Sequence, residues 1–210
     1  MFERLVLEQI KSTLIDLYGK EQHAFRPLGS TTTALVKIMD EISVSLDSKD
    51  TYAVHLTCLD VSKAFDRLQH AGLINYLLDC GVNSGFICSL RSYFQNRRAN
   101  VKCDGKFGPT FMVMSGVPQG SVLGPHLIGG IPFHWGSILI NLQAAKMVKY
   151  ADDITIIEAI PSLKSTSCLP SICTSINELG FEINYSKSKQ LCIQRSLENE
   201  RCYHSAVVAV

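Results

Sequence analysis

Two adjacent carboxylates stand at a turn between two β-type runs in the last third of the chain. Asp152 and Asp153 are preceded by the run at residues 146–149 and followed by the apolar run at residues 154–157. Alternating and β-branched residues on both sides predict a tight hairpin that exposes the paired acids at its tip. Because Asp-Asp is also an ordinary turn dipeptide, a metal site is indicated only if a third acid joins the pair.

Length and composition predict one packed globular domain. The chain has 210 residues, a hydrophobic fraction of 46% and a net charge of +1 at pH 7. Disorder is therefore excluded, and any nucleic-acid contact has to come from local basic patches rather than from a global field. No apolar run reaches the roughly 18 residues that a membrane span needs, and the N-terminus has no signal-peptide pattern. We expect no membrane association.

The eight cysteines are scattered through apolar segments and form no Cys-x-x-Cys pair. A disulfide framework is typical of short secreted chains, whereas this pattern favours free thiols. The pattern predicts an intracellular, reducing compartment, with nucleus and cytoplasm equally open.

Hydrophobic periodicity predicts the order of the elements. Helical spacing predicts helices at the start of the chain and after Ser30, which is a suitable N-cap. Asp104-Gly105 is a favoured turn for a hairpin over residues 99–114. Further predicted elements are a strand at 52–60, helices at 68–80 and 84–95, a helix after 121, a helix ending near 179–180, and strands at 181–184 and 190–194.

Asp60, at the C-terminal end of the predicted strand 52–60, supplies the third acid. If that strand lies beside the hairpin, Asp60 and Asp152 face each other across neighbouring strands. Three carboxylates in one place repel each other unless cations neutralise them, and hard oxygen ligands suit Mg²⁺. Two such ions, roughly 4 Å apart, can activate a 3′-hydroxyl and stabilise a pyrophosphate leaving group. The cluster predicts nucleotidyl transfer.

Five segments, in this order along the chain, resemble the motifs of reverse transcriptases from non-LTR (LINE-like) retrotransposons. They are residues 22–27 with 30–32, 59–66, 116–125, 150–153 and 179–187. The resemblance covers residues 1–195 and implies an α+β polymerase right-hand fold. Part of the fingers would occupy about 1–50, and a palm of antiparallel sheet packed on helices about 51–195. The thumb would be missing, and 196–210 would be an unpatterned C-terminal tail.

The resemblance implies an RNA-directed DNA polymerase that extends a DNA primer on an RNA template, using deoxynucleoside triphosphates and two Mg²⁺ ions, or Mn²⁺ in their place. Asp60 and Asp152 would be the principal metal ligands, and Asp153 would support them. Lys187 would protonate or screen the leaving pyrophosphate, and the nearby Lys189 is an alternative for that role.

The resemblance also implies a nucleotide pocket. Phe65 would be the steric gate that excludes a ribose 2′-hydroxyl, although core packing would also explain its ring. Arg26 would contact the triphosphate, or else be solvated beside Pro27. The other pocket residues would be Val61, Ser62, Lys63 and Ala64, through their backbone, together with Gln119 and Gly120.

Basic and aromatic residues are mixed between residues 91 and 106. Arg97, Arg98 and Lys102 would contact the primer–template backbone, and a solvated helix end explains them nearly as well. Asp66, in contrast, fits a structural role as a carboxylate at a helix start.

Two features depart from the family pattern. Residues 27–30 lack a basic residue before Ser30, and glycines and a proline at 126–136 would interrupt the apolar helix that follows Pro125. These departures keep an alternative open, namely a catalytically silent, decayed remnant that at most binds nucleic acid. A viral RNA-dependent polymerase is a third possibility, against which Phe65 and Ala151 argue.

Overall fold

The chain folds into two units, which are described separately. The computed structural model describes residues 2–130, 145–162, 165–178, 180–195 and 203–209. The helical unit comprises Met1–Leu17 and Lys63–Ile131, and the sheet unit comprises Tyr18–Ser62 and Pro132–Val210. The boundary expected near residue 50 between fingers and palm falls inside the sheet unit.

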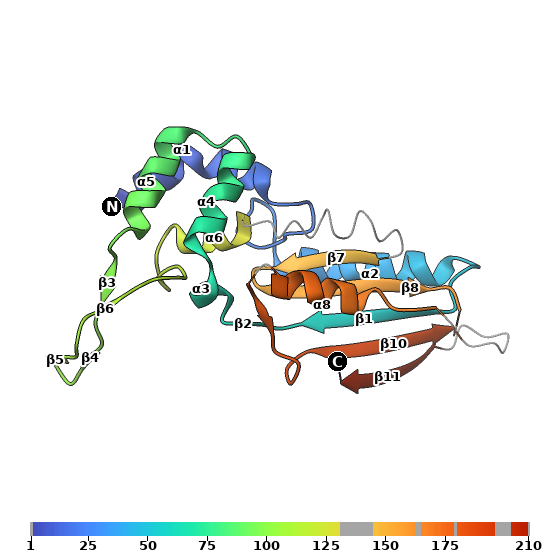
Figure 1. Ribbon diagram of the computed structural model, residues 1–210. Helices are drawn as coiled ribbons and strands as arrows, with labels where there is room; N and C mark the ends of the chain where they lie inside the picture. The colour runs from blue at the N-terminus through green and yellow to red at the C-terminus, as the bar shows by residue number, and fades with distance from the viewer. Residues whose placement is uncertain (1, 131–144, 163–164, 179, 196–202, 210) are drawn as a thin grey trace. The chain divides into compact units, whose positions relative to one another are not determined.

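A five-stranded antiparallel sheet forms the centre of the sheet unit, with the strand order β11-β10-β1-β8-β7 (Figure 1). The middle strand, β1, pairs with β8 on one side and with β10 on the other. The strands are β1 (Ala53–Leu59), β7 (Ala145–Tyr150), β8 (Asp153–Ile160), β10 (Lys189–Arg195) and β11 (Tyr203–Ala209). The predicted strand at 52–60 and the predicted hairpin around 150–153 are confirmed.

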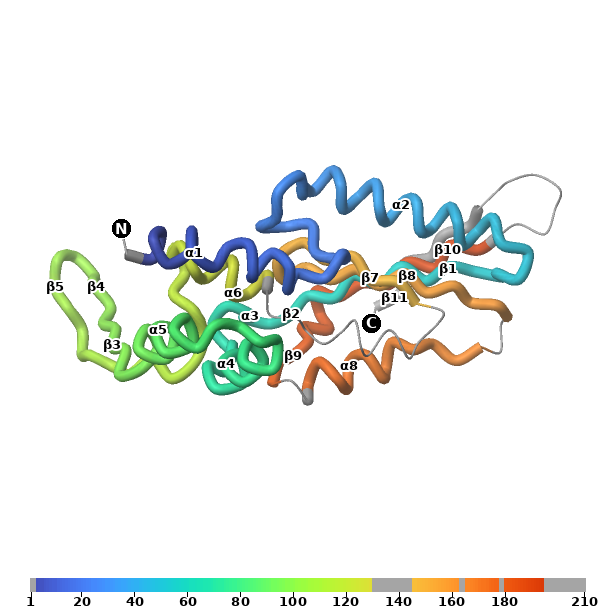
Figure 2. Tube along the Cα trace, turned by 90° about the horizontal axis from the view of Figure 1, so that it is seen from above, coloured from blue at the N-terminus to red at the C-terminus, as the bar shows by residue number. Residues whose placement is uncertain are grey.

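Helices α2 (Thr31–Asp47) and α8 (Leu169–Glu178) cover opposite faces of this sheet (Figure 2). Successive side chains of β8 point to opposite faces, so buried Ile157 packs in the cluster beneath α2 while buried Ile156 lies on the other face. On α2 the buried residues Ala34, Ile42 and Leu46 recur at helical spacing. Both helices are therefore fixed by their apolar faces.

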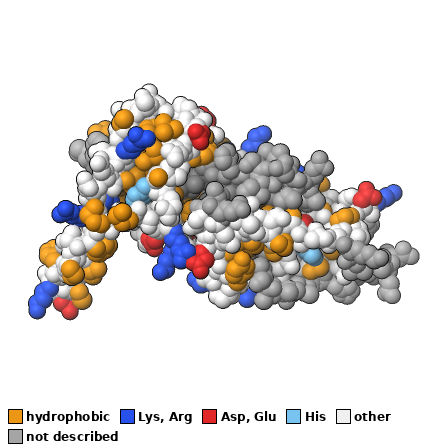
Figure 3. Space-filling view, in the orientation of Figure 1, with side chains coloured by type: hydrophobic (Ala, Val, Ile, Leu, Met, Phe, Trp, Pro, Cys, Tyr) orange, Lys and Arg blue, Asp and Glu red, His pale blue; other side chains and the backbone are white. Residues whose placement is uncertain are grey.

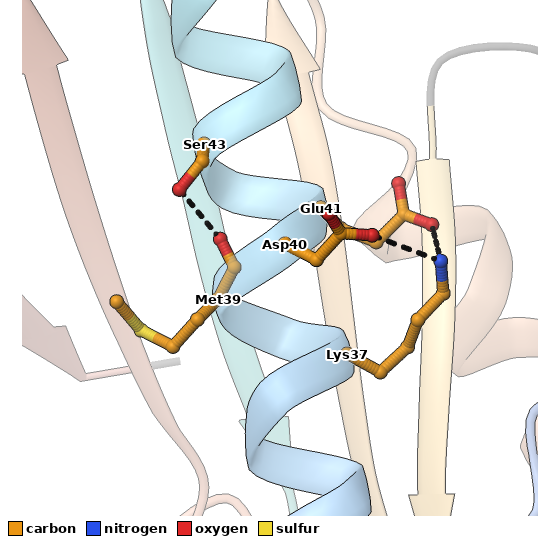
Figure 4. A network of polar contacts seen from close by, with 5 residues as sticks. All are labelled: Lys37, Met39, Asp40, Glu41 and Ser43. Carbon is orange, nitrogen blue, oxygen red and sulfur yellow. Dashed lines mark hydrogen bonds and ion pairs between the residues drawn. The ribbon is translucent and has the colours of Figure 1, made fainter.

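The start of α2 is capped as the sequence predicts. The Ser30 hydroxyl accepts a hydrogen bond from the Thr33 N–H at 3.1 Å, and the Thr33 hydroxyl accepts one from the Ser30 N–H at 2.9 Å. On its outer side, Lys37 lies 2.7 Å from Glu41 and 3.4 Å from Asp40 (Figure 4). Such exposed pairs add only about 0.3–0.5 kcal/mol each, so the apolar face dominates.

The helical unit is built from α1 (Phe2–Leu17), α3 (Ala64–Arg67), α4 (His70–Asp79), α5 (Ser84–Phe94) and α6 (Gly124–Gly130). Leu14, Leu77, Leu90 and Leu127 are its most deeply buried leucines. Gly81 ends α4 with a φ of 74°, a conformation that glycine adopts without cost. The helices predicted at 68–80 and 84–95 are confirmed as α4 and α5, and the short helix α3 precedes the first of them.

A long hairpin extends from the end of α5. Its strands are β3 (Arg98–Ala99), β4 (Lys102–Cys103), β5 (Lys106–Phe107) and β6 (Phe111–Met112). Asp104 and Gly105 both have positive φ, at 48° and 77°, as a two-residue type I′ turn requires. The predicted hairpin and its turn are confirmed.

Two segments for which the sequence predicts no regular element contain regular structure. Residues 203–209 form strand β11 against β10, because a β-prone edge segment gains a full ladder of backbone hydrogen bonds without an alternating pattern. Gly129 and Gly130 are the last two described residues of α6. Deep burial of Leu127 and Ile128 offsets a glycine cost of about 1 kcal/mol each. Residues 131–136 of the predicted interruption lie outside the described residues.

Two short strands of the sheet unit form a separate ladder. β2 (Val61–Ser62) follows Asp60 and pairs with β9 (Glu182–Ile183) in an antiparallel ladder. This pairing fixes the backbone just beyond β1, where the pocket residues were predicted. None of the helices in the described part of the chain is both long enough and apolar enough to cross a membrane.

Candidate active site

The acid turn, residues 150–153, closes the hairpin between β7 and β8. Tyr150 and Asp153 form its last strand pair, which leaves Ala151 and Asp152 as a two-residue loop. Ala151 has a φ of 57°, a positive value that fits the first loop residue of a tight hairpin turn. The adjacent acids are therefore held at the tip, as predicted, with Asp153 exposed and Asp152 half-buried.

Asp60 lies at the same edge of the sheet as the acid turn. Leu59, the last residue of β1, pairs with Ile154, which directly follows Asp153. Asp60 and the paired acids therefore lie at one edge of the sheet. That Asp60 faces Asp152, and that the three acids are metal ligands, remain predictions.

The negative charges of Asp60 and Asp152 act on the carboxyl group of Asp153. The pKa of Asp153 is raised above its ordinary value, chiefly by burial and then by the negative charges of Asp152 and Asp60. Hard carboxylate oxygens that repel one another are a donor set that suits a divalent cation with water or phosphate as further ligands. Among the described residues, no group of three or more His, Cys, Asp or Glu side chains is arranged to hold an ion. The residues fit a cation in chemistry, although the side chains are not gathered into a closed cage.

A turn after β9 fixes the backbone of Asp60. The Asp60 N–H donates to the Ser188 hydroxyl at 3.1 Å, and the Asp60 carbonyl accepts from the Asn184 N–H at 2.8 Å. The Ser188 hydroxyl in turn donates to the Asn184 carbonyl at 2.9 Å and is fully buried. Lys187 is exposed on this turn, with its N–H donated to the Asn184 carbonyl. The predicted lysine is thus tied through backbone contacts to a predicted metal ligand.

Asn184 and Ser188 were not singled out by the sequence analysis. The segment reads as a basic turn, and a buried serine in a charged stretch leaves no periodic signal. Gln22 was likewise quoted only as part of a motif. Its side chain is buried and hydrogen-bonds to the backbone of Ala151 in the acid turn.

Arg26 folds back onto its own loop. Its Nη1 donates to the carbonyls of Gly19 at 3.4 Å and Gln22 at 3.3 Å. These are long hydrogen bonds to neutral acceptors, so the guanidinium keeps unused donors. Arg26 is half-buried in the sheet unit, near Gln22 in sequence and in space.

The gate loop, residues 115–121, packs on the backbone of α3 within the helical unit. The Val117 N–H donates to the Phe65 carbonyl at 2.7 Å, and the Gly116 N–H donates to the Leu68 carbonyl at 2.8 Å. A Cβ on Gly116 would lie 2.7 Å from backbone atoms of Phe65 and Asp66. Only a glycine permits this approach. The predicted gate residue and the predicted pocket loop are therefore in direct contact.

Side chains complete the contact between α3 and the gate loop. The ring of His70 stacks on Phe94 with centroids 4.0 Å apart, and its Nε2 lies 2.7 Å from the Gly116 carbonyl. Gln119 is exposed and its Nε2 donates to the Asp66 carboxylate at 3.4 Å. Asp66 lies in the first turn of α3, as predicted for a carboxylate at a helix start, while Lys63 is the N-cap residue and makes no side-chain capping hydrogen bond.

Glu3 anchors the far end of the gate loop. Its carboxylate accepts from the Val122 N–H at 2.6 Å, from the Leu123 N–H at 3.4 Å and from the Tyr93 hydroxyl at 3.2 Å. An acid that receives free amides at the start of α6 stabilises the helix N-terminus. The sequence analysis missed Glu3, since a carboxylate in the first turn of α1 reads as an ordinary solvated residue.

Some of the remaining predicted pocket residues are buried, and others are exposed to solvent. Val61 in β2 and Ala64 in α3 are buried, so only their backbone could reach a ligand, as predicted. Lys63 between them has a φ of 51° and is exposed. Ser62 is half-buried, and Gly120 is exposed with a φ of 81°.

The hairpin β3–β6 carries basic and apolar side chains together, and hydrophobic atoms gather over it (Figure 3). Arg97 lies over the Tyr93 ring at 4.7 Å, and Lys102 over the Phe107 ring at 5.2 Å from the centroid. The exposed apolar residues of this segment are Val101, Phe107, Phe111, Met112 and Met114. Arg98 in β3 is also exposed. Basic groups beside exposed rings are typical of surfaces that bind single-stranded nucleic acid.

The chain is similar to known retrotransposon proteins. The probable RNA-directed DNA polymerase from transposon X-element of Drosophila melanogaster is 31% identical over 207 residues, which cover 91% of this chain and 22% of that protein. The RNA-directed DNA polymerase from mobile element jockey of Drosophila funebris is 27% identical over 95% of the chain and 22% of its own length. The chain thus spans less than a quarter of the length of these relatives.

Among solved structures, telomerase from Candida tropicalis in complex with the TWJ fragment of telomeric RNA matches with a TM-score of 0.67 at 13% identity. The match covers 89% of this chain and 33% of the telomerase. At this identity the likeness shows the fold alone, and it confirms the predicted α+β polymerase fold. The reverse transcriptase (RNA-dependent DNA polymerase) family profile matches residues 1–203. The resemblance to retrotransposon reverse transcriptases is confirmed, and the chain belongs to the reverse transcriptase family.

Proposed function

We propose that this chain is the catalytic part of an RNA-directed DNA polymerase that extends a DNA primer on an RNA template. The convergence of Asp60, Asp152 and Asp153 at one edge of the sheet carries the proposal. The negative charges of Asp152 and Asp60 help to raise the pKa of Asp153, and such repulsion is costly unless a cation neutralises it. Membership of the reverse transcriptase family supports the proposal.

Two divalent cations, Mg²⁺ or alternatively Mn²⁺, would be held by Asp60 and Asp152, with Asp153 in support. When bound, the ions activate the primer 3′-hydroxyl and stabilise the leaving pyrophosphate. The protein's own part is to keep the acids in place, which the contacts of Asn184 and Ser188 to the Asp60 backbone support. Lys187, on the same turn, would donate a proton to the leaving pyrophosphate or screen its charge.

The incoming deoxynucleoside triphosphate would contact the residues that the family resemblance assigns to its pocket. Arg26 has unused donors for a phosphate, and the backbone of residues 61–64 would lie along the triphosphate. Gln119 and Gly120 would line the pocket. Phe65 would exclude a ribose 2′-hydroxyl, and the hydrogen bond from Val117 to its carbonyl supports a fixed position for the gate.

The RNA template would lie against the hairpin β3–β6. Arg97, Arg98 and Lys102 would contact phosphates, and the exposed ring of Phe107 would stack on a base. Because each phosphate contact releases bound counterions, Lys102→Gln should lower the slope of log affinity against log salt by about 1. An unchanged slope would remove Lys102 from the interface.

Primer extension on a polyribonucleotide template with Mg²⁺ tests the proposal. Wild-type protein should incorporate deoxynucleotides, and Asp152→Asn should abolish incorporation because it removes a metal ligand. Asp79→Asn is a matched control, an exposed acid at the end of α4 that should leave incorporation unchanged. Equal activity of wild type and Asp152→Asn would refute the metal assignment, and inactivity of both would indicate a silent remnant.

The gate has a separate test. Phe65→Val should admit ribonucleotides, because the smaller side chain leaves room for a 2′-hydroxyl. The measurement is the ratio of deoxynucleotide to ribonucleotide incorporation by each protein. An unchanged ratio would leave Phe65 with a packing role only.

A further inference from the structure

The loop that carries Asp152 begins with a residue in an uncommon backbone conformation. Ala151 has a φ of 57°, and among the residues of the acid turn it alone has a positive value. The left-handed region crowds a side chain's Cβ against the following carbonyl, so residues other than glycine stay there only when the surroundings hold them. Whatever holds Ala151 therefore also sets the direction in which Asp152 and Asp153 leave the loop.

The side-chain amide of Gln22 holds both backbone groups of Ala151. The Ala151 N–H donates to Gln22 Oε1 at 3.0 Å, and Gln22 Nε2 donates to the Ala151 carbonyl at 3.2 Å. Oε1 also accepts from the Ala24 N–H at 3.0 Å. The two N–H donors require an oxygen at that position, so the orientation of the amide is determined by its partners. Gln22 is 2% exposed.

The backbone around Gln22 is itself attached to β7. The His23 N–H donates to the Lys149 carbonyl at 2.9 Å, and the Lys149 N–H donates to the Glu21 carbonyl at 2.7 Å. Gln22 and Lys149 form a parallel bridge. The amide thus reaches Ala151 from a segment that is fixed to the same hairpin, two residues before the loop. Because the backbone of Gln22 is fixed, its side-chain amide can restrain the loop.

We propose that Gln22 is a positioning residue that holds the acid turn in the conformation in which Asp152 and Asp153 can share a divalent cation. The inference rests on the proposed function, since it concerns the metal ligands of that reaction. Gln22 touches neither substrate nor cation. It acts by satisfying the only two backbone hydrogen-bonding groups of the left-handed residue, which lies directly before the acids.

Glutamine is the residue type that this contact requires. One end must accept from two N–H groups and the other must donate to a carbonyl, which a carboxylate at neutral pH cannot do. A glutamate here would also add a fourth negative charge near Asp60, Asp152 and Asp153. Gln22→Met keeps the length and neutrality of the side chain while removing both hydrogen bonds. Gln22→Asn keeps the amide but shortens its reach.

Mn²⁺ binding to the 210-residue chain, measured by the loss of free-ion electron paramagnetic resonance signal, tests the proposal. Gln22→Met should weaken Mn²⁺ affinity by about tenfold and Gln22→Asn by less, because a buried hydrogen-bond pair is lost or stretched. Glu158→Gln is the matched control. It also spoils one hydrogen bond of a buried side chain, to Ser167 or Cys168, but it lies five residues from Asp153 along β8. It should change affinity less than twofold.

A second variant separates positioning from general destabilisation. Glycine adopts the left-handed conformation without strain, so Ala151→Gly added to Gln22→Met should restore part of the lost Mn²⁺ affinity. The proposal would be overturned if Gln22→Met and Glu158→Gln bound Mn²⁺ with equal affinity, or if the double variant recovered none of the lost affinity. It would also be overturned if the wild-type chain bound no Mn²⁺. A wild type that binds Mn²⁺ but extends no primer would refute the polymerase function alone, because the Mn²⁺ comparison still decides the role of Gln22.

Discussion

The acid turn and the gate loop are held in place by different kinds of contact. Two buried side chains from distant segments hold the acids: Gln22 hydrogen-bonds to the backbone of Ala151 in the acid turn, and Ser188 accepts from the backbone of Asp60 beside it. The gate loop depends on direct backbone hydrogen bonds to α3 and on Gly116, which has no Cβ. A side-chain contact can be weakened in steps by mutation, whereas a backbone contact at van der Waals distance tolerates no added atom.

The gate loop should therefore show the largest single effect. Gly116→Ala places a Cβ 2.7 Å from backbone atoms of Phe65 and Asp66, at a φ of 81°. We expect the free energy of unfolding to fall by about 3 kcal/mol or more, from overpacking and backbone strain together. Urea denaturation measures this change.

Gly81→Ala is the matched control for that experiment. It has a similar φ of 74° in the same unit, but a Cβ there meets nothing within 4 Å. Only the conformational cost remains, about 1 kcal/mol. Equal losses in the two variants would show that the close approach of the gate loop to α3 contributes nothing.

A substitution beside the acid turn should lower the free energy of unfolding by less than Gly116→Ala does. Ser188→Ala removes the acceptor of the Asp60 N–H and a donor to the Asn184 carbonyl, at a position without solvent exposure. The free energy of unfolding should fall by about 2 kcal/mol, because the Asp60 N–H loses its acceptor, while the Asn184 carbonyl keeps the N–H groups of Lys187 and Ser188 as donors. Ser186→Ala, two residues earlier and exposed, should change it by less than about 0.5 kcal/mol. Similar values for both serines would contradict the anchoring of Asp60 by Ser188.

The same contrast explains what the sequence could predict. Apolar periodicity and the Ser30 cap predicted α1, α2 and α5, since these signals are local. Motif order predicted Asp60 and the acid turn, and the Val-Pro-Gln-Gly stretch predicted the gate loop. In each of these cases the information lies within a few neighbouring residues.

Contacts between distant residues escaped prediction. Gln22 and Ala151 are 129 residues apart, and Asp60 and Ser188 are 128 apart, so no window of sequence pattern contains either pair. α6 forms despite its glycines because burial of Leu127 and Ile128 outweighs local propensity.

The smallest expected effect is the pH dependence of the free energy of unfolding that comes from the charge of the acid turn. The acid turn places two carboxylates side by side, whereas the residues of the gate loop itself are uncharged. The raised pKa of Asp153 means that its ionised form is disfavoured in the folded state. The contribution of Asp153 to the free energy of unfolding is fully present below the pKa of 3.8 that it has in the unfolded chain. It is lost as the pH rises through its higher pKa in the folded state. Asp153→Asn should therefore raise the free energy of unfolding at pH 7 and leave it unchanged at pH 3.

Because Asp153 is exposed, solvent screening keeps this gain to a few tenths of a kcal/mol. Urea denaturation at the two pH values measures it, with Asp79→Asn as the exposed control acid. Adding Mg²⁺ at pH 7 should reduce the advantage of the variant, since the cation neutralises the repulsion that the substitution removes. If Mg²⁺ did not reduce the gain in the free energy of unfolding at pH 7, the acids would repel one another without binding the ion. The acid turn would then not be a Mg²⁺ site.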